Sequence, residues 1–450
     1  MHSLHTHLNT IYRDFDIRGK YPEEITPEEV FKIARALSLY FSLKNVAIGY
    51  DIRPSAIVLY EALEQGFRES GVNVTNLGLC TTPMTYFIGG STSIDMTVMI
   101  TASHMPSDYN GLKITVEDAR PVSKEILQEI RTIVGTHTFS EETIHGSIST
   151  HALQPEWIQK FKMNHNLSNA NLSIVIDPAN MIGILEIETF KAFEPDIKVH
   201  TIFDTFDHTA PNHEANPLIH ETLISLGQEV VRTKSDLGIA FDGDADRVGF
   251  VDENGIPVPS DIIGALLCKP ILSKSPHATV VYDVRCTSAL RKEILRLGGT
   301  PIREKVGHTH IRKRMRESEA ELGIELSGHF FFKESFYSEG GALPVFLIME
   351  LMNQERKSLS ELAREVNTKF NSGEINSTIS RPVPEIFKDL ETHFNHATFE
   401  YIDGLSVMCE NWWCNIRPSA NDPVVRLNLE AESKELMQEM RDEVLHIIRS

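Results

Sequence analysis

The sequence predicts an α/β protein with three consecutive, similar α/β domains and a smaller C-terminal α+β domain. Short apolar runs alternate with amphipathic helical patterns, and this alternation starts again near residues 172 and 261. After about residue 379 the order changes to one helix, several closely spaced strands and a final helix. A length of 450 residues, with 41% hydrophobic and 24% charged residues, is typical of a globular chain with several cores.

The first block begins with a clear helix signal. Thr26-Pro27-Glu28-Glu29 is a capping box with Pro at the first helical position, and apolar residues follow at helical spacing as far as Phe41. Short apolar runs indicate buried strands, and Gly71 stops a second helical pattern. The remaining elements expected here are strands Val46–Tyr50, Val72–Leu77 and Met96–Ile100 and helix Ala56–Ser70.

The later blocks repeat this pattern, and we expect domains at residues 1–150, 151–254, 255–370 and 371–450. In the second block we expect strands Leu172–Ile176, Lys198–Ile202 and Leu237–Phe241 and helices Ile184–Phe193 and Leu218–Val231. In the third we expect helices Asp261–Leu272, Ser288–Leu297 and Thr309–Ser318 and strands Thr279–Tyr282, Thr300–Arg303 and Glu321–Glu325. In the last we expect strands Phe399–Ile402, Leu405–Glu410 and Val424–Leu429 and helix Lys434–Ile448.

Composition limits the partners and the cellular compartment that we expect for the protein. The net charge of −20 argues against nucleic acid as a partner, and any anionic ligand must be held by a local group of Arg and Lys. Five scattered cysteines without C-x-x-C pairs fit a reducing compartment, so we expect a cytoplasmic protein. We expect no membrane association, because no apolar run reaches the length of a membrane span.

Three carboxylates at alternate positions are the strongest chemical signal. Asp242, Asp244 and Asp246 lie between two apolar runs, and without a cation they would repel one another. Carboxylate oxygens are hard ligands, so the spacing predicts one divalent metal ion. Magnesium is the first choice, because it leaves coordination positions open for phosphate oxygens.

Three other interpretations fit this loop less well. An EF-hand needs Gly at loop position 6, where this chain has Arg247, and it needs helices where the flanks resemble strands. Asp244-Ala245-Asp246-Arg247-Val248 matches the D-x-D-x-[TV] pattern of aspartyl-phosphate phosphatases, but there the nucleophile ends a strand directly, and here the strand runs into Asp242. A solvated acidic turn would not explain three aspartates between apolar strands.

A second polar segment follows strand Met96–Ile100, where α/β folds present reactive groups. Its sequence, a polar loop from Thr101 to Lys113, is Thr-Ala-Ser-His-Met-Pro-Ser-Asp-Tyr-Asn-Gly-Leu-Lys. This segment resembles the phosphoserine loop of the α-D-phosphohexomutases, of the phosphomannomutase/phosphoglucomutase type, and the aspartate loop resembles that family's magnesium loop. Further similar segments follow in the family's order: Phe15–Gly19, Tyr50–Ser55, Gly307-His308, Glu325–His329 and Arg417–Pro423.

The resemblance implies four domains around a central cleft, and it assigns roles to individual residues. Ser103 would carry the phosphoryl group, with Lys113 as acid/base, Arg18 and Arg247 as charge stabilisers and His104 beside the nucleophile. The metal ligands would be Ser103, Asp242, Asp244 and Asp246. The expected sugar-binding residues are Lys305, His308, Glu325, Ser327 and His329, and the expected phosphate-binding residues are Arg417, Ser419, Asn421 and Arg426. We expect Arg53 to form a structural ion pair.

The predicted function is therefore the interconversion of hexose 6-phosphate and hexose 1-phosphate, of mannose, glucose or both. The resemblance implies a phosphoserine enzyme, one Mg²⁺ per chain, and a hexose 1,6-bisphosphate that serves as intermediate and activator. A phosphosugar is the expected partner of a monomer or small homo-oligomer. Three alternatives stay open here: a phosphoglucosamine mutase, an aspartyl-phosphate sugar phosphatase and a degenerate sugar-phosphate binder.

Overall fold

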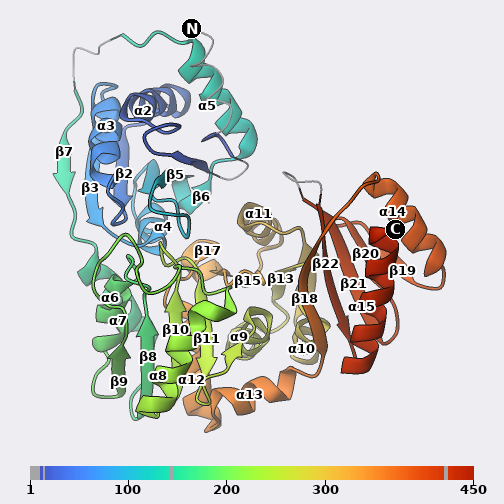
Figure 1. Ribbon diagram of the computed structural model, residues 1–450. Helices are drawn as coiled ribbons and strands as arrows, with labels where there is room; N and C mark the ends of the chain where they lie inside the picture. The colour runs from blue at the N-terminus through green and yellow to red at the C-terminus, as the bar shows by residue number, and fades with distance from the viewer. Residues whose placement is uncertain (1–10, 14–15, 141–144, 420–423) are drawn as a thin grey trace. The chain divides into compact units, whose positions relative to one another are not determined.

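The computed structural model describes residues 11–13, 16–140, 145–419 and 424–450 (Figure 1). Its contacts divide the chain into two units, one formed by residues 1–259 and 327–360 and the other by residues 260–326 and 361–450. The expected arrangement around one central cleft stays a prediction.

The first sheet is mixed and brings the ends of two functional segments together. Strands β2 (Asn45–Tyr50) and β4 (Met96–Ile100) are parallel neighbours, with Tyr50 opposite Ile100. The segments that follow them must therefore lie side by side at the carboxyl edge. The sheet order is β1-β5-β4-β2-β3-β7, with β6 beside β5. The other strands are β1 (Ile17–Lys20), β3 (Asn73–Leu79), β5 (Tyr109–Val116), β6 (Arg120–Pro121) and β7 (Ile148–Thr150).

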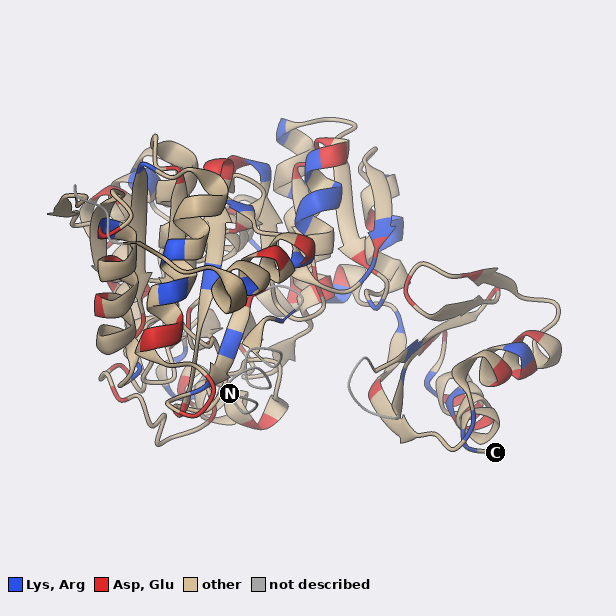
Figure 2. Cartoon of the chain, turned by 90° about the horizontal axis from the view of Figure 1, so that it is seen from above, with Lys and Arg blue, Asp and Glu red and all other residues tan. Residues whose placement is uncertain are grey.

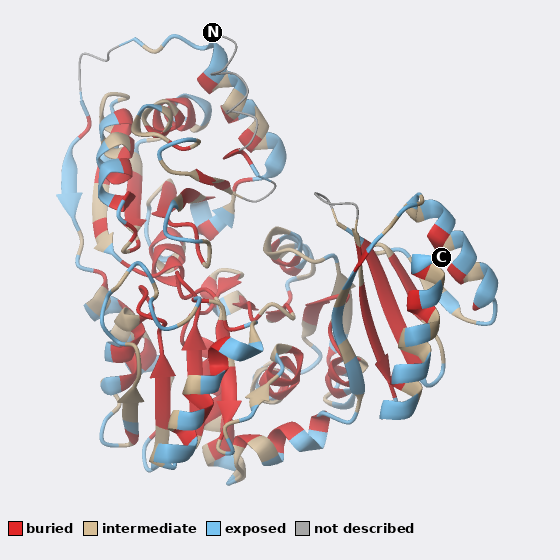
Figure 3. Ribbon diagram, viewed as in Figure 1, coloured by how far each residue is buried: buried red, intermediate tan, exposed pale blue. Residues whose placement is uncertain are grey.

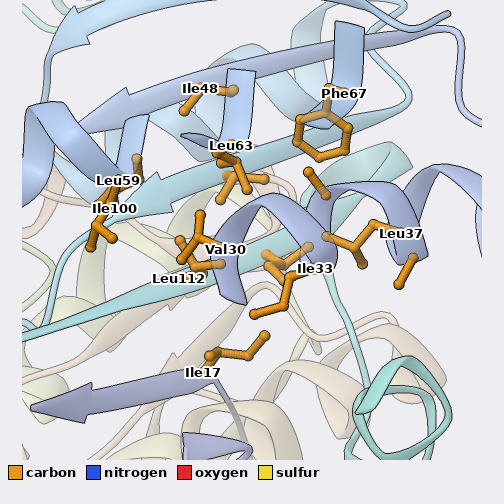
Figure 4. Close-up of a cluster of buried hydrophobic side chains, with 14 of the residues drawn as sticks. Ile17, Val30, Ile33, Leu37, Ile48, Leu59, Leu63, Phe67, Ile100 and Leu112 are labelled. Atoms are coloured by element: carbon orange, nitrogen blue, oxygen red, sulfur yellow. The ribbon is translucent and has the colours of Figure 1, made fainter. Parts of the chain in front are cut away.

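Both helices predicted for this part are present, and the predicted cap of the first is confirmed. Thr26 Oγ1 accepts the amide of Glu29 at 3.2 Å, which confirms the cap of α2 (Pro27–Phe41). The apolar face of α2 packs with α3 (Ala56–Arg68) and the first sheet in one buried cluster (Figure 4). Helices α4 (Thr82–Ser91) and α5 (Lys124–Thr136) complete the set.

The second sheet ends in the hairpin that carries the aspartates. Strand β10 (Leu237–Phe241) is parallel to β8 (Leu172–Asp177) and antiparallel to β11 (Val248–Asp252). The sheet order is β12-β11-β10-β8-β9, and its central strands are buried (Figure 3). The remaining elements are β9 (Ile197–Thr201), β12 (Pro257–Val258), α6 (Gln154–Asn164), α7 (Ile184–Lys191) and α8 (Ile224–Thr233).

The helix expected over Leu218–Val231 begins later than predicted. Residues His220–Leu223 form a 3₁₀ turn and the α-helix begins at Ile224. Asn216 explains the delay, because its carbonyl and side-chain oxygens accept hydrogen bonds from Thr222 and from the Leu218 amide, which holds the preceding backbone in a turn.

A buried carboxylate connects two helices of the second block to Thr81, the residue that precedes α4. Glu186 on α7 is fully buried and accepts hydrogen bonds from Trp157 Nε1 at 2.9 Å and Thr81 Oγ1 at 3.2 Å. Burial raises the pKa of Glu186 to about 7. Residues Ser327–Ser360 belong to the same unit and contribute β16 (Phe330–Phe332), β17 (Ser338–Glu339) and the nearly all-apolar helix α12 (Leu343–Glu355).

We expect Glu186→Gln to change how stability depends on pH. Between about pH 5 and pH 7 the folded protein keeps a proton on Glu186 that the unfolded chain has lost, so the free energy of unfolding falls with rising pH by up to about 3 kcal/mol. The Gln variant should lose this slope and be more stable than the wild type at pH 8. Denaturant unfolding at several pH values measures the effect. Glu188→Gln, exposed on the same helix, is the control and should keep the wild-type slope.

In the second unit, parallel strands again end at one edge. Strand β13 (Thr279–Asp283) lies between β14 (Thr300–Glu304) and β15 (Leu322–Ile324). Helix α9 (Ser260–Lys274) precedes β13, α10 (Ser288–Arg296) connects β13 to β14, and α11 (His308–Ser318) connects β14 to β15, in the expected order. Helix α13 (Leu359–Val366) then leads towards the last sheet.

The last sheet is entirely antiparallel and contains a strand that the sequence did not predict. Its order is β18-β22-β21-β20-β19. Strand β18 (Phe370–Thr378) is mostly polar and exposed, because it is an edge strand, so it lacks the apolar run that predicts a buried strand. The other elements are β19 (Thr398–Glu400), β20 (Leu405–Met408), β21 (Trp412–Pro418), β22 (Val424–Ala431), α14 (Val383–His393) and α15 (Lys434–Arg449).

Three features of the structure bear on the composition argument. Basic and acidic residues are interspersed along the helices near the C-terminus (Figure 2). Among the described residues, no helix is long and apolar enough to cross a bilayer. All five cysteines are free thiols.

Candidate active site

Part of the segment predicted as a polar loop is a strand. Residues Tyr109–Val116 form β5, which pairs with β4 and places Lys113 opposite Met99. The polar residues of this stretch gave no strand signal, although β5 lies between β1 and β4 and pairs with both. Lys113 therefore projects from a sheet and has a fixed position, while the loop proper covers residues 101–108.

Ser103 is held in an unusual backbone conformation at the carboxyl edge of the first sheet. Its φ is +54°, which is uncommon outside glycine, and its exposed fraction is 2%. The Oγ atom donates to Asp242 Oδ2 at 3.0 Å and lies 3.2 Å from His104 Nδ1. The hydroxyl of Ser103 is thus placed directly against the aspartate loop.

The aspartate loop is the turn between β10 and β11, and its backbone is ordered by its own first carboxylate. Asp242 Oδ1 accepts the amides of Asp246 at 3.1 Å and Arg247 at 3.2 Å. Gly243 allows the loop to approach Ser103, because a Cβ atom at this position would lie 2.2 Å from the Ser103 carbonyl oxygen. Both flanks are strands, which excludes an EF-hand, and β10 ends directly before Asp242, as expected.

The three aspartates can hold a metal ion. One carboxylate oxygen from each of Asp242, Asp244 and Asp246 lies within 4.8 Å of the others, and all three residues are buried. The Oδ1 atoms of Asp244 and Asp246 are buried without a hydrogen-bond partner. Burial, together with the charges of Asp246 and Asp244, raises the pKa of Asp242 to about 7. A hard divalent cation would satisfy these orphaned oxygens and remove the repulsion.

Lys113 neutralises part of this negative charge. Its Nζ atom lies 2.5 Å from both Asp244 Oδ2 and Asp246 Oδ2. Burial alone would lower the Lys113 pKa, but these two carboxylates raise it well above its usual value. The Arg18 guanidinium on β1 forms an ion pair with Asp16. Burial opposes its charge, but the negative charges of Asp16, Asp244 and Asp246 raise the Arg18 pKa.

Two histidines lie beside the same loop. Burial, reinforced by the positive charges of Arg247 and Arg18, lowers the pKa of His104 to about 3, so its imidazole is neutral near pH 7. His329 Nε2 lies 3.3 Å from Asp246 Oδ1 and accepts a hydrogen bond from Arg247 Nε at 3.1 Å. Its Nδ1 atom lies 3.0 Å from Ser327 Oγ, so Ser327 and His329 belong to the surroundings of the aspartate loop.

The second unit collects a separate group of predicted residues. Glu325 follows β15, is buried and accepts the amide of Gly307 at 2.7 Å, just before His308 begins α11. Gly307 has a φ of +127°, a conformation that L side chains rarely adopt, so this tight approach needs glycine. Lys305 is exposed on the same connection.

The predicted phosphate-binding arginines lie opposite each other on neighbouring strands. Arg417 on β21 lies opposite Arg426 on β22 in the strand register. The Glu374 carboxylate on β18 forms an ion pair with Arg417 at 2.8 Å and with Arg426 at 3.2 Å. Asp403 lies 3.8 Å from Arg417. The amide of Ser419 donates to the Val424 carbonyl at 2.9 Å, and Asn421 lies outside the described residues.

Arg285 is a candidate site residue that our sequence analysis missed. It follows β13 and binds Asp283 through two nitrogens, at 3.1 Å and 2.8 Å. Burial opposes its charge, while Asp283 and then Glu325 raise its pKa. Burial lowers the pKa of Arg417, and the positive charge of Arg285 lowers it further. Its position directly after a parallel strand was the signal that could have identified it.

The predicted residues therefore form two groups, one in each unit. The first unit brings together the predicted nucleophile, the predicted metal ligands and their basic neighbours: Arg18, Ser103, His104, Lys113, Asp242, Asp244, Asp246, Arg247, Ser327 and His329. The second places Glu325 against the Gly307 amide before His308, and it joins Arg417 and Arg426 through Glu374.

Family comparisons explain why these groups occur in one chain. Phosphoglucomutase/phosphomannomutase domain models match in order: α/β/α domain I at residues 10–141, α/β/α domain II at 151–255, α/β/α domain III at 259–370 and the C-terminal domain at 365–447. The chain belongs to the phosphoglucomutase/phosphomannomutase family. This confirms the predicted series of three α/β domains and a C-terminal domain.

Individual relatives of this phosphohexomutase agree over nearly the whole length. A phosphomannomutase of Methanocaldococcus jannaschii is 33% identical to this chain, and the match covers 97% of each of the two sequences. A phosphoglucomutase/phosphomannomutase family protein of Burkholderia thailandensis has a crystal structure with a TM-score of 0.89 at 27% identity, covering 97% of this chain and 96% of that one.

A more distant likeness concerns the fold alone. An N-acetylphosphoglucosamine mutase of Aspergillus fumigatus, solved in complex with glucose 1,6-bisphosphate, matches with a TM-score of 0.56 at 13% identity, and the match covers 97% of this chain and 94% of that one. With the closer relatives, the family assignment makes this phosphohexomutase an enzyme of the isomerase type, an intramolecular phosphotransferase.

Proposed function

We propose that the enzyme interconverts hexose 6-phosphate and hexose 1-phosphate, of mannose, glucose or both, through a phosphoserine at Ser103 and a hexose 1,6-bisphosphate. One observation carries the proposal: the Ser103 hydroxyl lies 3.0 Å from Asp242 in a cluster of three metal-competent aspartates. Phosphoryl transfer depends on positioning and charge neutralisation, and this cluster offers both.

The proposed step moves one phosphoryl group and one proton. The P–O bond to Ser103 Oγ breaks, and a P–O bond to the free sugar hydroxyl forms. The hydroxyl proton passes to neutral Lys113, which then returns a proton to Ser103 Oγ, so that Ser103 leaves the step as its alcohol and Lys113 is neutral again. The bisphosphate then returns its other phosphoryl group to Ser103 by the reverse chemistry, and the isomerised monophosphate leaves.

Lys113 has the position for this acid/base role, but its pKa must fall. Asp244 and Asp246 raise it, and burial opposes them. Once the charges of these carboxylates are neutralised, burial lowers the pKa of Lys113 towards the working pH. Arg18 and Arg247 remain as fixed positive charges near the transferred group.

The donor set supports Mg²⁺ as the resident ion, held by Asp242, Asp244, Asp246 and an oxygen of phosphorylated Ser103. All are hard oxygen ligands, and orphaned oxygens of Asp244 and Asp246 are available. When bound, the ion would neutralise charge on the transferred phosphoryl group.

The second phosphate of the substrate needs its own basic residues. We assign it to Arg417, Arg426, Ser419 and Asn421, and we add Arg285, because a planar guanidinium binds phosphate through two hydrogen bonds. Glu325 and Ser327 would accept or donate hydrogen bonds to ring hydroxyls. Lys305, His308 and His329 are the other proposed sugar-binding residues.

The decisive experiment combines intact-mass analysis with activity assays. After incubation with glucose 1,6-bisphosphate and Mg²⁺, we expect one added phosphate on Ser103, mapped by peptide sequencing, and isomerisation of mannose 1-phosphate, glucose 1-phosphate or both. A hydroxylamine-labile phosphate on Asp244 would contradict the proposal and favour the phosphatase. Turnover confined to glucosamine 1-phosphate would favour a phosphoglucosamine mutase, and saturable binding without any isomerisation would favour a binder.

We expect Arg417→Lys to weaken substrate binding. A lysine cannot reproduce the paired hydrogen bonds of a guanidinium, so the KM for hexose monophosphate should rise about 10- to 100-fold. Steady-state kinetics measure this change. Arg381→Lys is the matched control, because Arg381 also pairs with a carboxylate, that of Asp389, at 2.5 Å in the same domain. An unchanged KM for Arg417→Lys would remove Arg417 from the phosphate-binding set.

Four wider assignments also remain proposals: the domain limits, the location, the partner and the oligomeric state. We propose that the domains end at residues 150, 254 and 370. The cytoplasmic location is proposed from five free cysteines, four of them buried. A phosphosugar is the proposed partner, and the expected monomer or small homo-oligomer stays a prediction.

A further inference from the structure

A buried ion pair lies beneath the loop that carries Ser103. Arg53 and Asp51 follow strand β2, and their exposed fractions are 2% and 1%. Arg53 Nε donates to Asp51 Oδ2 at 3.1 Å, and the Arg53 amide donates to Asp51 Oδ1 at 3.0 Å. This confirms the expected ion pair, but the pair accounts for only part of the hydrogen bonding of Arg53.

The guanidinium of Arg53 also binds four carbonyl oxygens of the neighbouring loop. One terminal nitrogen donates to Ser103 and Met105, each at 2.7 Å. The other donates to Pro106 at 2.6 Å and Tyr109 at 3.0 Å. Every side-chain nitrogen of Arg53 is thus engaged, and three of the four carbonyls belong to residues 103–106.

Asp51 is linked to the Ser103 amide through the hydroxyl of Thr101. The Ser103 amide donates to Thr101 Oγ1 at 2.9 Å, and Thr101 Oγ1 donates to Asp51 Oδ2 at 2.7 Å. The two polar backbone groups of Ser103 therefore both lead to the same ion pair, its carbonyl to Arg53 and its amide through Thr101 to Asp51. The hydrogen bonds form a closed ring around the nucleophile.

This ring encloses the one strained residue of the loop. A non-glycine residue in the left-handed region carries a conformational cost, and it persists only where its surroundings hold it. In that conformation the Ser103 side chain reaches Asp242. A relaxed φ would move Oγ away from the aspartates, and a displacement of about 1 Å is enough to cost about 10²-fold in rate.

We propose that Asp51, Arg53 and Thr101 are positioning residues, which lock the Ser103 backbone so that its Oγ atom faces the aspartate cluster. This inference rests on the proposed function, because it concerns the rate at which Ser103 receives and donates a phosphoryl group. Arginine is required, because lysine has three donors on one atom and cannot span four carbonyls and a carboxylate.

The test uses Arg53→Lys and the nearly isosteric Thr101→Val, with Arg35→Lys as the matched control. Arg35 is also buried, with 5% exposed, and it pairs with Glu69 at 3.3 Å and donates to the Ser140 carbonyl, but it does not contact the Ser103 loop. Phosphate uptake by Ser103 from glucose 1,6-bisphosphate is followed by rapid quench and mass spectrometry. The kcat and KM of the mutase reaction and the thermal unfolding midpoint are measured in parallel.

We expect Arg53→Lys to lower kcat and the phosphorylation rate by about 10²-fold and Thr101→Val to lower them by about 10-fold, with KM changed by less than about threefold. Arg35→Lys should lower only the unfolding midpoint. Wild-type kcat in folded Arg53→Lys and Thr101→Val would overturn the inference. It would also be overturned if Arg35→Lys lowered kcat as much as these two variants do. A wild-type chain that takes no phosphate on Ser103 would overturn the proposed function, and this inference with it.

Discussion

Replacing Ser103 by Ala should reduce mutase turnover by at least about 10⁴-fold, because the substitution removes the oxygen that carries the phosphoryl group. The added mass after incubation with glucose 1,6-bisphosphate should disappear as well. The fold should survive, since the Arg53 and Thr101 hydrogen bonds reach the backbone of Ser103 and not its hydroxyl. Coupled assays of sugar phosphate isomerisation and intact-mass spectra measure the two effects.

Ser107→Ala provides the control within the same loop. Ser107 is exposed, so its loss should leave both turnover and phosphorylation at the wild-type level. If Ser103→Ala retained wild-type turnover, or still gained one phosphate, the nucleophile would have to be another residue, and the covalent part of the proposed mechanism would be wrong.

Replacing Asp244 by Asn should have the second largest effect. The substitution keeps the shape of the side chain and removes one of three negative ligands. Because a metal ion in such a site contributes several kcal/mol to transition-state stabilisation, we expect turnover at limiting Mg²⁺ to fall about 10²- to 10³-fold. Excess Mg²⁺ should restore part of it. Mg²⁺ should raise the thermal unfolding midpoint of the wild type more than that of the variant, because a ligand stabilises the state that binds it.

Asp252→Asn controls for the loss of a buried carboxylate in the same hairpin. Asp252 lies at the other end of β11, where its Oδ1 atom accepts the amides of Asn254 and Ile256, each at 2.9 Å. We expect its Mg²⁺ response to match that of the wild type. Equal Mg²⁺ dependence in Asp244→Asn and the wild type would show that Asp244 is not a metal ligand.

The fold was predictable wherever a segment carries its own signal. Apolar runs identified the buried strands β4 and β10, and the capping box at Thr26 identified α2. Strands β5 and β18 were missed, because hydrogen bonds to neighbouring strands stabilise them and their polar residues show no apolar run. The apolar sequence of α12 gives no amphipathic period, since the helix is buried on most sides.

The same distinction applies to the candidate site. The aspartates and Ser103 were recognisable, because the chemistry of each motif lies in a few adjacent residues. The double ion pair of Lys113 with Asp244 and Asp246 joins residues more than 130 positions apart, and no local pattern contains it. Arg285 was overlooked for the same reason, as its nearness to Glu325 and Arg417 arises only from packing.

By itself the sequence indicated the candidate metal ligands, the order of the domains and the family resemblance, because residue type and spacing are carried along the chain. Only the tertiary structure decided the backbone conformation of Ser103 and the closed ring of Asp51, Arg53 and Thr101 around it. The physical reason is that β2 and β4 are adjacent parallel strands. Their pairing brings together two loops that lie about fifty residues apart, and a buried guanidinium must then find acceptors there.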